Sequence, residues 1–305
     1  MDVHQVRCFV TVAEESHFGR AAERLHLTPS PVSRAVKDLE RELGVDLLIR
    51  RYHQVELTPA GRAVLARARE LLAGFDDLKA TARGAARDTP RVIHVGGTYL
   101  APPALFDRVV DLAEEVAAGR PVDVRVAPSA ELLPDVGSGA LDLALVHLPV
   151  DEALLDSLPI ARYQFMVAMR SDDPLAGASA LKLADLTDRT FTITSPKVQP
   201  AAMNRLHDYL VKSGITRFHE LPGNDVSLVA GHVRRSHGLA LAVSPAAGGS
   251  SRVFDDPAFA LVPLRDDDLD FTVGVIWRRD RAGQGDVAAL AKAVRSAWSA
   301  GPTVV

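Results

Sequence analysis

Five polar side chains recur at helical spacing between residues 30 and 41. They are Ser30, Ser33, Arg34, Lys37 and Arg41. Steps of three or four residues place side chains on one face of an α-helix. Such a helix fits the major groove of DNA, where an arginine can donate two hydrogen bonds to a guanine edge. Taken alone, Arg34 and Lys37 fit an ordinary solvated face better, so the surrounding elements must decide between the two interpretations.

The elements around this face predict a helix-turn-helix. Apolar residues of the same segment form a second stripe, at Val32, Val36, Leu39 and Leu43. Apolar spacing predicts a first helix over residues 6–13, and residues 18–25 predict a second, short helix. Two helices joined by a tight turn are typical of this DNA-binding motif. We therefore interpret Ser33 and Arg34 as base-reading residues and Lys37 as a phosphate contact.

A wing is predicted directly after this helix. Gly44 is a helix stop, and residues 47–57 read as two short strands around a turn. The turn region carries Arg50, Arg51 and His53. Contacts to phosphates restrict side-chain geometry less than contacts to bases, so these three residues are predicted to bind the DNA backbone.

Residues 58–89 predict one long helix with a narrow apolar seam. Thr58 can cap it, and Pro59 suits the first helical position. The seam alternates steps of three and four residues through Gly61, Val64, Ala68, Leu71, Phe75, Leu78, Ala82 and Ala85. This pattern is typical of a coiled coil, and we predict dimerisation through Val64, Ala68, Leu71, Phe75 and Leu78. The alternative is a helix that packs only on its own domain.

From residue 91 onward, strands and helices alternate. Strands are predicted at 92–95, 122–126, 141–146, 165–169, 191–194, 239–243 and 271–277. Helices are predicted at 105–117, 201–211, 226–235 and 287–300. This alternation indicates an α/β domain with largely parallel sheets. About 215 residues is large for one sheet, so we expect two lobes that share crossover strands.

Composition limits the function classes. The net charge is −4, and residues 1–90 are almost neutral, with 14 basic and 13 acidic residues, so any DNA-binding surface must be a local cluster. A single cysteine, Cys8, excludes a disulfide within the chain and fits a reducing cytoplasm. The first residues lack the pattern of a signal peptide, and no apolar run predicts a membrane span.

One continuous stretch resembles the winged helix-turn-helix of the LysR-type transcriptional regulators. It reads FGRAAERLHLTPSPVSRAVKDLERELGVDLLIRR and is followed by VELTPAG; LDLALV and HGLALAVSP match the family more weakly further on. The resemblance implies a DNA-binding domain at 1–58, a dimerising linker helix at 59–89 and an effector-binding domain at 90–305. The effector domain would resemble periplasmic binding proteins, with lobe 1 at about 90–161 and 268–305 and lobe 2 at about 162–267. Homodimers and homotetramers on double-stranded promoter DNA would follow.

The start of the DNA-reading helix departs from the family pattern. Many members have Ser-Gln-Pro-Ala where this chain has Thr28, Pro29, Ser30 and Pro31, so the glutamine that often reads a base is absent. A residue before proline avoids the α region, which favours Ser30 as the N-cap with Pro31 in the first position. The family alignment suggests Thr28 as the cap, which leaves Ser30 freer to face DNA. Thr28 and Ser30 complete the predicted DNA-binding residues.

An effector cleft is predicted where strands end. A two-lobed α/β domain binds its ligand between the lobes, near the carboxyl ends of strands. Thr98, Tyr99, Ser129 and His147 follow predicted strands of one lobe, and Ser195 and Pro196 follow a strand of the other. By family analogy, Val226 opens a helix that faces the same region. Thr98 and Ser129 fit simple helix caps equally well, and His147 a strand-end histidine. The family resemblance implies a small organic acid or another metabolite as the effector.

Enzyme activity is not predicted. The sequence lacks a GxSxG elbow, a Walker A motif, a GxGxxG motif and HExxH, and no metal or cofactor is expected. The other alternative is an architectural DNA-binding protein whose C-terminal part only oligomerises. A thermal-shift screen against metabolites separates the three classes: stabilisation without turnover supports a sensor, turnover an enzyme, and silence an architectural protein.

Overall fold

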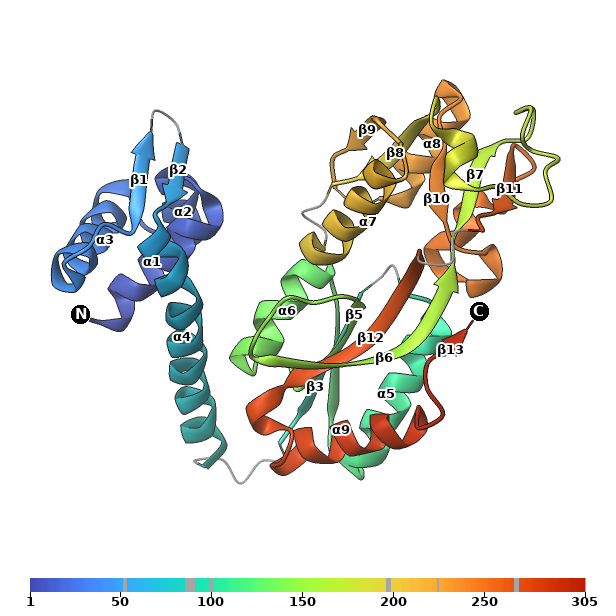
Figure 1. Ribbon diagram of the computed structural model, residues 1–305. Helices are drawn as coiled ribbons and strands as arrows, with labels where there is room; N and C mark the ends of the chain where they lie inside the picture. Colours follow the sequence, from blue (N-terminus) through green and yellow to red (C-terminus); the bar gives the residue numbers. More distant parts are fainter. Residues whose placement is uncertain are drawn as a thin grey trace. The chain divides into compact units, whose positions relative to one another are not determined.

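The chain folds into two compact units, Met1–Asp88 and Thr89–Val305. The computed structural model describes residues 1–51, 54–85, 91–98, 101–195, 199–223, 225–265 and 269–304 (Figure 1). Among these residues, none of the helices combines the length and the apolar character that a membrane span requires. Each unit has its own core and is described by itself.

The smaller unit is a winged helix-turn-helix with a long C-terminal helix. Its elements are α1 (Val3–Glu15), α2 (Phe18–Arg24), α3 (Pro29–Leu43), β1 (Leu48–Arg51), β2 (Gln54–Leu57) and α4 (Pro59–Ala85). β1 and β2 pair antiparallel, as predicted for the wing. Phe9, Leu39 and Leu47 are its largest fully buried side chains, so α1, α3 and the start of the wing share one core.

The prediction that Ser30 caps α3 is wrong. The helix begins at Pro29, its N-cap is Thr28, and the Thr28 side chain makes no capping hydrogen bond. The first four backbone N–H groups of a helix lack intrahelical acceptors, so Pro29 and Pro31 remove no hydrogen bond there. Ser30 is therefore a helical residue, and its side chain is exposed. Gly44 ends the helix in a left-handed conformation, with φ of 70°.

Helix α4 starts in tight contact with the wing. Thr58 caps it as predicted, because its Oγ1 accepts a hydrogen bond from the Gly61 N–H at 2.9 Å. A Cβ added at Gly61 would lie 2.1 Å from the Leu47 carbonyl oxygen, so only glycine fits this contact. Val64 and Ala68 pack on the core of the same unit, whereas Leu71 and Leu78 are 49% and 65% exposed. Phe75 is half-buried.

The larger unit contains a six-stranded sheet, which with its helices is called lobe 1. The lobe comprises β3 (Ile93–Gly97), α5 (Pro103–Ala117), β4 (Val122–Val126), α6 (Ser129–Ser138), β5 (Leu143–His147), β6 (Leu155–Gln164), β12 (Asp270–Arg278), α9 (Gly285–Ala297) and β13 (Thr303–Val304). The strand order is β13-β6-β12-β5-β3-β4. Neighbouring residues of β5 belong to different cores: Leu143 and Leu145 pack with α5 and α9, and Ala144 and Val146 with α6. The helices therefore cover both faces of the sheet.

Lobe 2 is built on two smaller sheets. It comprises β7 (Met166–Arg170), β8 (Thr190–Thr194), α7 (Pro200–Lys212), β9 (Arg217–Leu221), α8 (Val226–Ser236), β10 (Ala240–Ala242) and β11 (Phe259–Pro263), with short 3-10 helices at Leu183–Leu186, Pro245–Ala247 and Gly249–Phe254. The strand orders are β10-β7-β11 and β8-β9. Phe165, Phe191 and Leu210 belong to its main core. Phe271 packs against this core and against that of lobe 1, so it lies where the lobes meet.

The expected fold class is observed, but the sheets are mixed rather than largely parallel. β3 runs parallel to β4 and β5, β13 to β6, and β8 to β9. Each of the seven predicted strands overlaps an observed one, and β6, β9, β11 and β13 were not predicted. β12 runs antiparallel to both β5 and β6, and β7 runs antiparallel to β10 and β11. β6 leads into lobe 2 and β12 returns from it, so these two strands run in opposite directions (Figure 1).

The pair of β6 and β12 connects the lobes. Their register shifts between Val273 and Gly274, where a Cβ added at Gly274 would lie 2.7 Å from the Leu158 carbonyl oxygen. β5 pairs with β12 only from Val273 onward. Towards lobe 2, residues 270–272 of β12 pair with residues 162–164 of β6. The sheet thus narrows as it approaches lobe 2.

Candidate functional site

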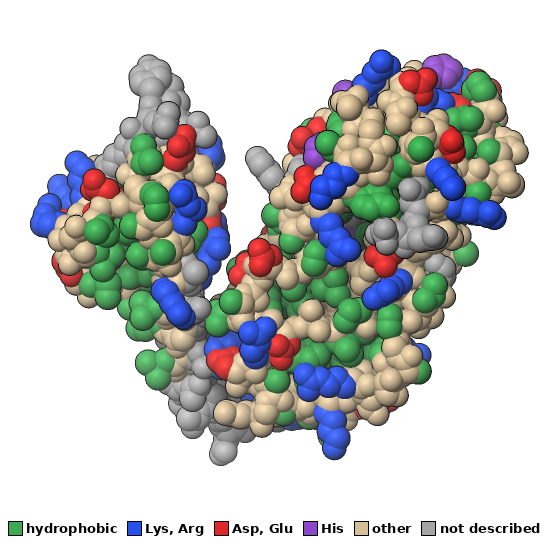
Figure 2. All heavy atoms as spheres, viewed as in Figure 1, with side chains coloured by type: hydrophobic (Ala, Val, Ile, Leu, Met, Phe, Trp, Pro, Cys, Tyr) green, Lys and Arg blue, Asp and Glu red, His purple; other side chains and the backbone are tan. Residues whose placement is uncertain are grey.

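The exposed face of α3 is the candidate DNA-binding surface. Val32, Val36 and Leu39 are fully or almost fully buried against α1 and α2, whereas Arg34 and Lys37 are exposed. Val32, Val36 and Leu39 are thus confirmed as the buried stripe, whereas Leu43, the fourth residue predicted for it, is 39% exposed near the end of the helix. Ser33 is half-buried. Figure 2 shows basic side chains gathered over α3 on the smaller unit.

We expect Arg34→Ala to remove sequence preference while leaving weak, salt-sensitive DNA binding. Loss of a bidentate contact to a base costs about 1–3 kcal/mol of discrimination. Lys37→Ala is the contrasting variant: it should weaken operator and random DNA equally and reduce the salt dependence. Gel-shift titrations against both DNAs at several salt concentrations measure this. Unchanged discrimination in Arg34→Ala would contradict the assignment.

A buried carboxylate on α3 holds the wing. Glu40 is only 9% exposed, and its Oε1 accepts hydrogen bonds from the backbone N–H groups of Leu47 and Leu48 at 2.9 and 3.1 Å. The start of β1 is thereby tied to the last turns of the reading helix. Sequence patterns did not reveal this role, although a glutamate directly after Leu39 of the apolar stripe was the available signal.

Part of the predicted wing contact lies outside the described structure. The backbones of Arg50 and Arg51 belong to β1, which places them on the wing. Their side chains, and the whole of His53, fall outside the described residues. The phosphate contacts assigned to these three residues stay a prediction.

Three predicted effector residues come together at the carboxyl end of the lobe 1 sheet. Thr98 follows β3, Ser129 begins α6 after β4, and His147 ends β5; all three are buried. The His147 N–H donates to Ser129 Oγ at 3.3 Å, and the Thr98 N–H donates to the Leu145 carbonyl at 3.0 Å. Thr98 Oγ1 has no hydrogen-bond partner among the described residues. Buried hydroxyls are normally paired, so Thr98 has unused hydrogen-bonding capacity.

The predicted residues of lobe 2 are less closely grouped. Ser195 is buried after β8, and Val226 packs with a core of lobe 2 at the start of α8. Tyr99 and Pro196 lie outside the described residues. A connection that was not predicted comes from Gln199, whose Nε2 donates to the carbonyls of His147 at 2.8 Å and Pro149 at 3.4 Å. This buried side chain ties the start of α7 to lobe 1.

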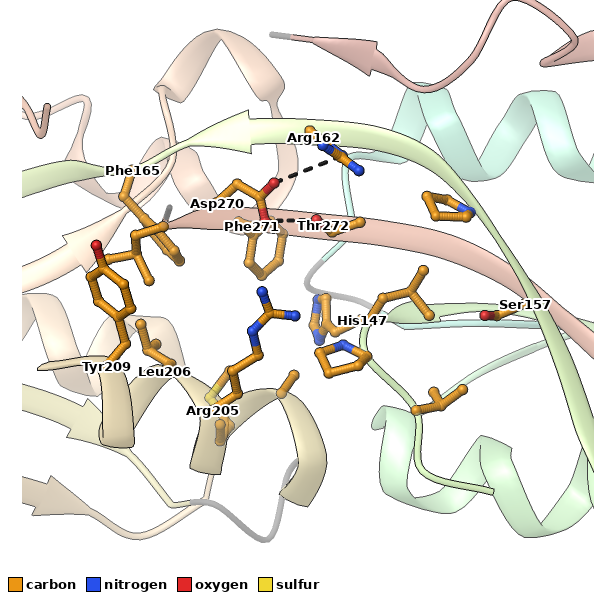
Figure 3. A pocket seen from close by; sticks show the side chains of 17 residues that line it. His147, Ser157, Arg162, Phe165, Arg205, Leu206, Tyr209, Asp270, Phe271 and Thr272 are labelled. Carbon is orange, nitrogen blue, oxygen red and sulfur yellow. Dashed lines mark hydrogen bonds and ion pairs between the residues drawn. The ribbon is translucent and has the colours of Figure 1, made fainter. Parts of the chain in front are cut away.

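A cavity of about 490 Å³ lies between α7 and the connecting strands (Figure 3). Its walls are formed by His147, Leu148, Pro149, Val150, Ser157, Pro159, Arg162, Phe165, Ala202, Met203, Arg205, Leu206, Tyr209, Leu269, Asp270, Phe271 and Thr272. This volume is within the range of small-molecule sites. Of the predicted effector residues, only His147 lines it. The cavity therefore adjoins the predicted cleft, on the side of α7 and β12.

Charged groups in the cavity have distinct environments. Arg162 Nε lies 3.7 Å from an Asp270 carboxylate oxygen, and Thr272 Oγ1 donates to the other oxygen at 2.8 Å. Arg205 has no hydrogen-bond or ion-pair partner among the described residues, and Figure 3 shows its guanidinium directed towards Phe271 and His147. Burial lowers the pKa of His147 to about 4, so this imidazole is neutral at pH 7.

Sequence reasoning missed most of the cavity wall. The helix that carries Arg205 was predicted, but its sequence does not reveal which face meets lobe 1. Phe271 was assigned to a strand core. The available signal was the spacing of Ala202, Leu206 and Tyr209 around Arg205, which places a cation beside a small and apolar surface.

Two family models match the chain. The model described as "Bacterial regulatory helix-turn-helix protein, lysR family" matches residues 3–62, and "LysR substrate binding domain" matches residues 91–299. The regulator BudR of Raoultella terrigena is 30% identical over 92% of this chain and 95% of its own length. A probable hydrogen peroxide-inducible genes activator of Mycobacterium xenopi is 37% identical over 56% of this chain and 91% of its own length.

Solved structures share the fold over the whole chain. Full-length BenM has a TM-score of 0.56 at 22% identity, covering 98% of this chain and 97% of its own. Full-length CbnR in complex with its target DNA has a TM-score of 0.53 at 20% identity, covering 97% and 99%. The second family model alone covers more than half of this chain, and BudR aligns over nearly all of it. The chain belongs to the LysR family of DNA-binding transcriptional regulators.

Proposed function

We propose that this regulator is a cytoplasmic homotetramer controlled by a small molecule that binds in the cavity between its lobes. The observation that supports this proposal is the cavity itself, because both lobes and the strands that connect them contribute to its walls. A ligand in contact with both lobes can favour one arrangement of the lobes over another.

The proposed assembly rests on the chain order. Residues 1–58 would bind promoter DNA, 59–89 would dimerise, and 90–305 would bind the effector. Leu71 and Leu78 support dimerisation through α4, because they are exposed and lie seven residues apart on the predicted coiled-coil seam. Val64 and Ala68 would contribute less, since they already pack within their own unit.

Signal transfer would require two assembly states with different affinities for the effector. We propose that the effector changes the orientation of the lobes, and with it the packing of effector domains and the spacing of paired α3 helices on DNA. Gln199 is placed to transmit this change, since its side chain joins α7 to the chain after β5.

Sensing through a disulfide within one chain does not fit this sequence. The chain has one cysteine, and Cys8 lies fully buried in the smaller unit. Burial, with a smaller contribution from Asp2, raises the pKa of its thiol, which lowers the fraction of reactive thiolate at neutral pH. A small-molecule effector is therefore the better-supported signal.

A ligand screen combined with footprinting tests the proposal. Compounds that stabilise the full-length protein should change the footprint or the DNA bending over its own upstream region. Ala202→Trp fills the cavity and should abolish both the stabilisation and the change in footprint. Ala201→Trp, on the same helix but outside the cavity lining, is the matched control. Identical footprints with and without a saturating ligand would refute the coupling.

A further inference from the structure

Among the described residues of the cavity wall, one cation has no ion-pair partner. Arg162 and Arg205 are the two cationic residues of this wall, and Asp270 is its acidic residue. Asp270 lies against Arg162 and also accepts the hydrogen bond from Thr272. Arg205 has no such partner in the described part of the chain. The formal charges of the described lining residues therefore match a ligand with a single negative charge.

A second, independent feature is an unpaired imidazole in the cavity wall. His147 is 1% exposed, and neither of its ring nitrogens has a hydrogen-bond partner among the described residues. Buried polar side chains are normally hydrogen-bonded, so both ring nitrogens have hydrogen-bonding capacity that the described residues do not use. In its neutral form the ring has one N–H group, which can donate a hydrogen bond to an anionic oxygen. His147 and Arg205 both line this cavity, and Figure 3 shows the Arg205 guanidinium directed towards the imidazole.

The remaining wall suits a flat apolar group. The Phe271 ring lies 4.7 Å from the His147 ring and 6.0 Å from the Phe165 ring, measured between centroids. Both contacts are tilted or edge-on, as expected for aromatic rings. Met203 and Leu206 line the cavity from α7. An aromatic ring would be covered by apolar atoms here while its charged end reaches Arg205.

We propose that the effector is a monoanion with a flat apolar body, whose anionic oxygens bind the guanidinium of Arg205 and the imidazole N–H of His147. This inference rests on the proposed effector function of the cavity and adds the chemical class of the ligand. A dianion would bring a second negative charge, for which the described lining residues offer no further unpaired cation. A neutral analogue would leave Arg205 unpaired, and a short acid would leave the apolar wall uncovered.

Four probes and calorimetry on the full-length protein test the class. Phenylacetate has the proposed charge and shape. 2-Phenylacetamide is its neutral isostere, phenylmalonate has two carboxylates, and acetate lacks the ring. We expect phenylacetate to bind at least about tenfold more tightly than each of the others, the size expected for one charge-assisted hydrogen bond or one buried ring. Equal or tighter binding of any of the three, or no binding of phenylacetate at about 10 mM, would overturn the proposal.

Variants of Arg205 test whether this residue causes the preference for the acid over the neutral amide. Arg205→Gln should weaken phenylacetate binding by about tenfold or more and bring the acid and the amide to similar affinities. Arg205→Lys keeps a cation and should retain the preference for the acid. Arg235→Gln, an exposed arginine of α8 outside the cavity, is the matched control and should change neither value. An unchanged preference for the acid in Arg205→Gln would overturn the role of this residue.

The same measurements separate this inference from the proposed function. If Ala202→Trp blocks a screened ligand of another chemical class, the effector site stands and the monoanion class fails. If Ala202→Trp blocks no ligand that changes the footprint, the proposed site fails as well. Thermal unfolding of every variant, recorded without ligand, verifies that loss of binding is not loss of folding.

Discussion

Replacing Glu40 by alanine is expected to destabilise the DNA-binding unit by about 3–6 kcal/mol. The carboxylate accepts hydrogen bonds from the Leu47 and Leu48 N–H groups. A hydrogen bond to a charged group contributes about 1.5–3 kcal/mol, and removal of the acceptor leaves two donors unsatisfied next to the core. The wing should detach from α3, and specific DNA binding should be lost with it.

Hydrogen exchange in the full-length protein measures this effect locally. Both tryptophans, Trp277 and Trp298, lie in the larger unit, so their fluorescence does not report on the wing. The Leu47 and Leu48 amides should exchange much faster in Glu40→Ala. Glu40→Gln keeps an acceptor oxygen and should retain most of the protection. Unchanged protection of the two amides in Glu40→Ala, compared with the unsubstituted protein, would show that the carboxylate does not hold the wing.

Acidification is expected to destabilise the larger unit through His147, by about 3 kcal/mol between pH 6.5 and pH 4. The pKa of this buried imidazole is about 4 in the folded protein, against about 6.5 in an unfolded chain. Between these values the unfolded state binds more protons than the folded state. Stability is therefore lost as pH falls through this window and is fully present above it.

Comparison with His147→Gln isolates this contribution from the carboxylates that titrate in the same range. Glutamine cannot take up the proton, so the free energy of unfolding of the variant should fall less steeply between pH 6.5 and pH 4. Urea unfolding followed by the fluorescence of Trp277 and Trp298 reports on the larger unit. Parallel pH curves for the two proteins would contradict the assignment.

The DNA-reading helix could be predicted from the sequence because the residues that specify it lie within a few positions of one another. Val32, Val36 and Leu39 repeat at helical spacing, and burial follows directly from that repeat. Its first residue could not be fixed in the same way. Ser30 and Thr28 are both good caps, and the rule for residues before proline favoured Ser30. In the structure, Ser30 is nevertheless helical, and Pro31 lies in the first turn, where its missing N–H costs no backbone hydrogen bond.

The unpredicted strands lack the patterns that identify strands. β6 contains Pro159 and mixes buried with exposed residues without alternation, and β9 is mostly exposed beside β8. Their strand conformation depends on neighbours that are distant in the sequence. β12, which pairs with β6, lies more than 100 residues further along the chain.

Residues of the candidate cleft could be predicted only where they directly follow a strand. Thr98, Ser129 and His147 were found because each follows a strand of one sheet. Arg205 and Phe271 were not found, since their place in the cavity depends on how two lobes pack. A helical arginine carries no local sign that it faces a cavity rather than solvent.

The narrowing of the sheet between the lobes has a mechanical consequence. Near lobe 2 the paired strands are reduced to a ribbon of residues 163–164 and 270–271, because β13 still pairs with Arg162 and the Leu148 N–H still donates to the Thr272 carbonyl. Backbone hydrogen bonds make such a ribbon stiff against stretching, whereas two-stranded ribbons tolerate a wide range of twist. Relative motion of the lobes should therefore be mainly torsional. Asp270 lies on this ribbon, Arg162 directly adjoins it, and both line the cavity. A ligand bound beside them would act close to the axis of rotation, where a small displacement turns the far end of a lobe the most.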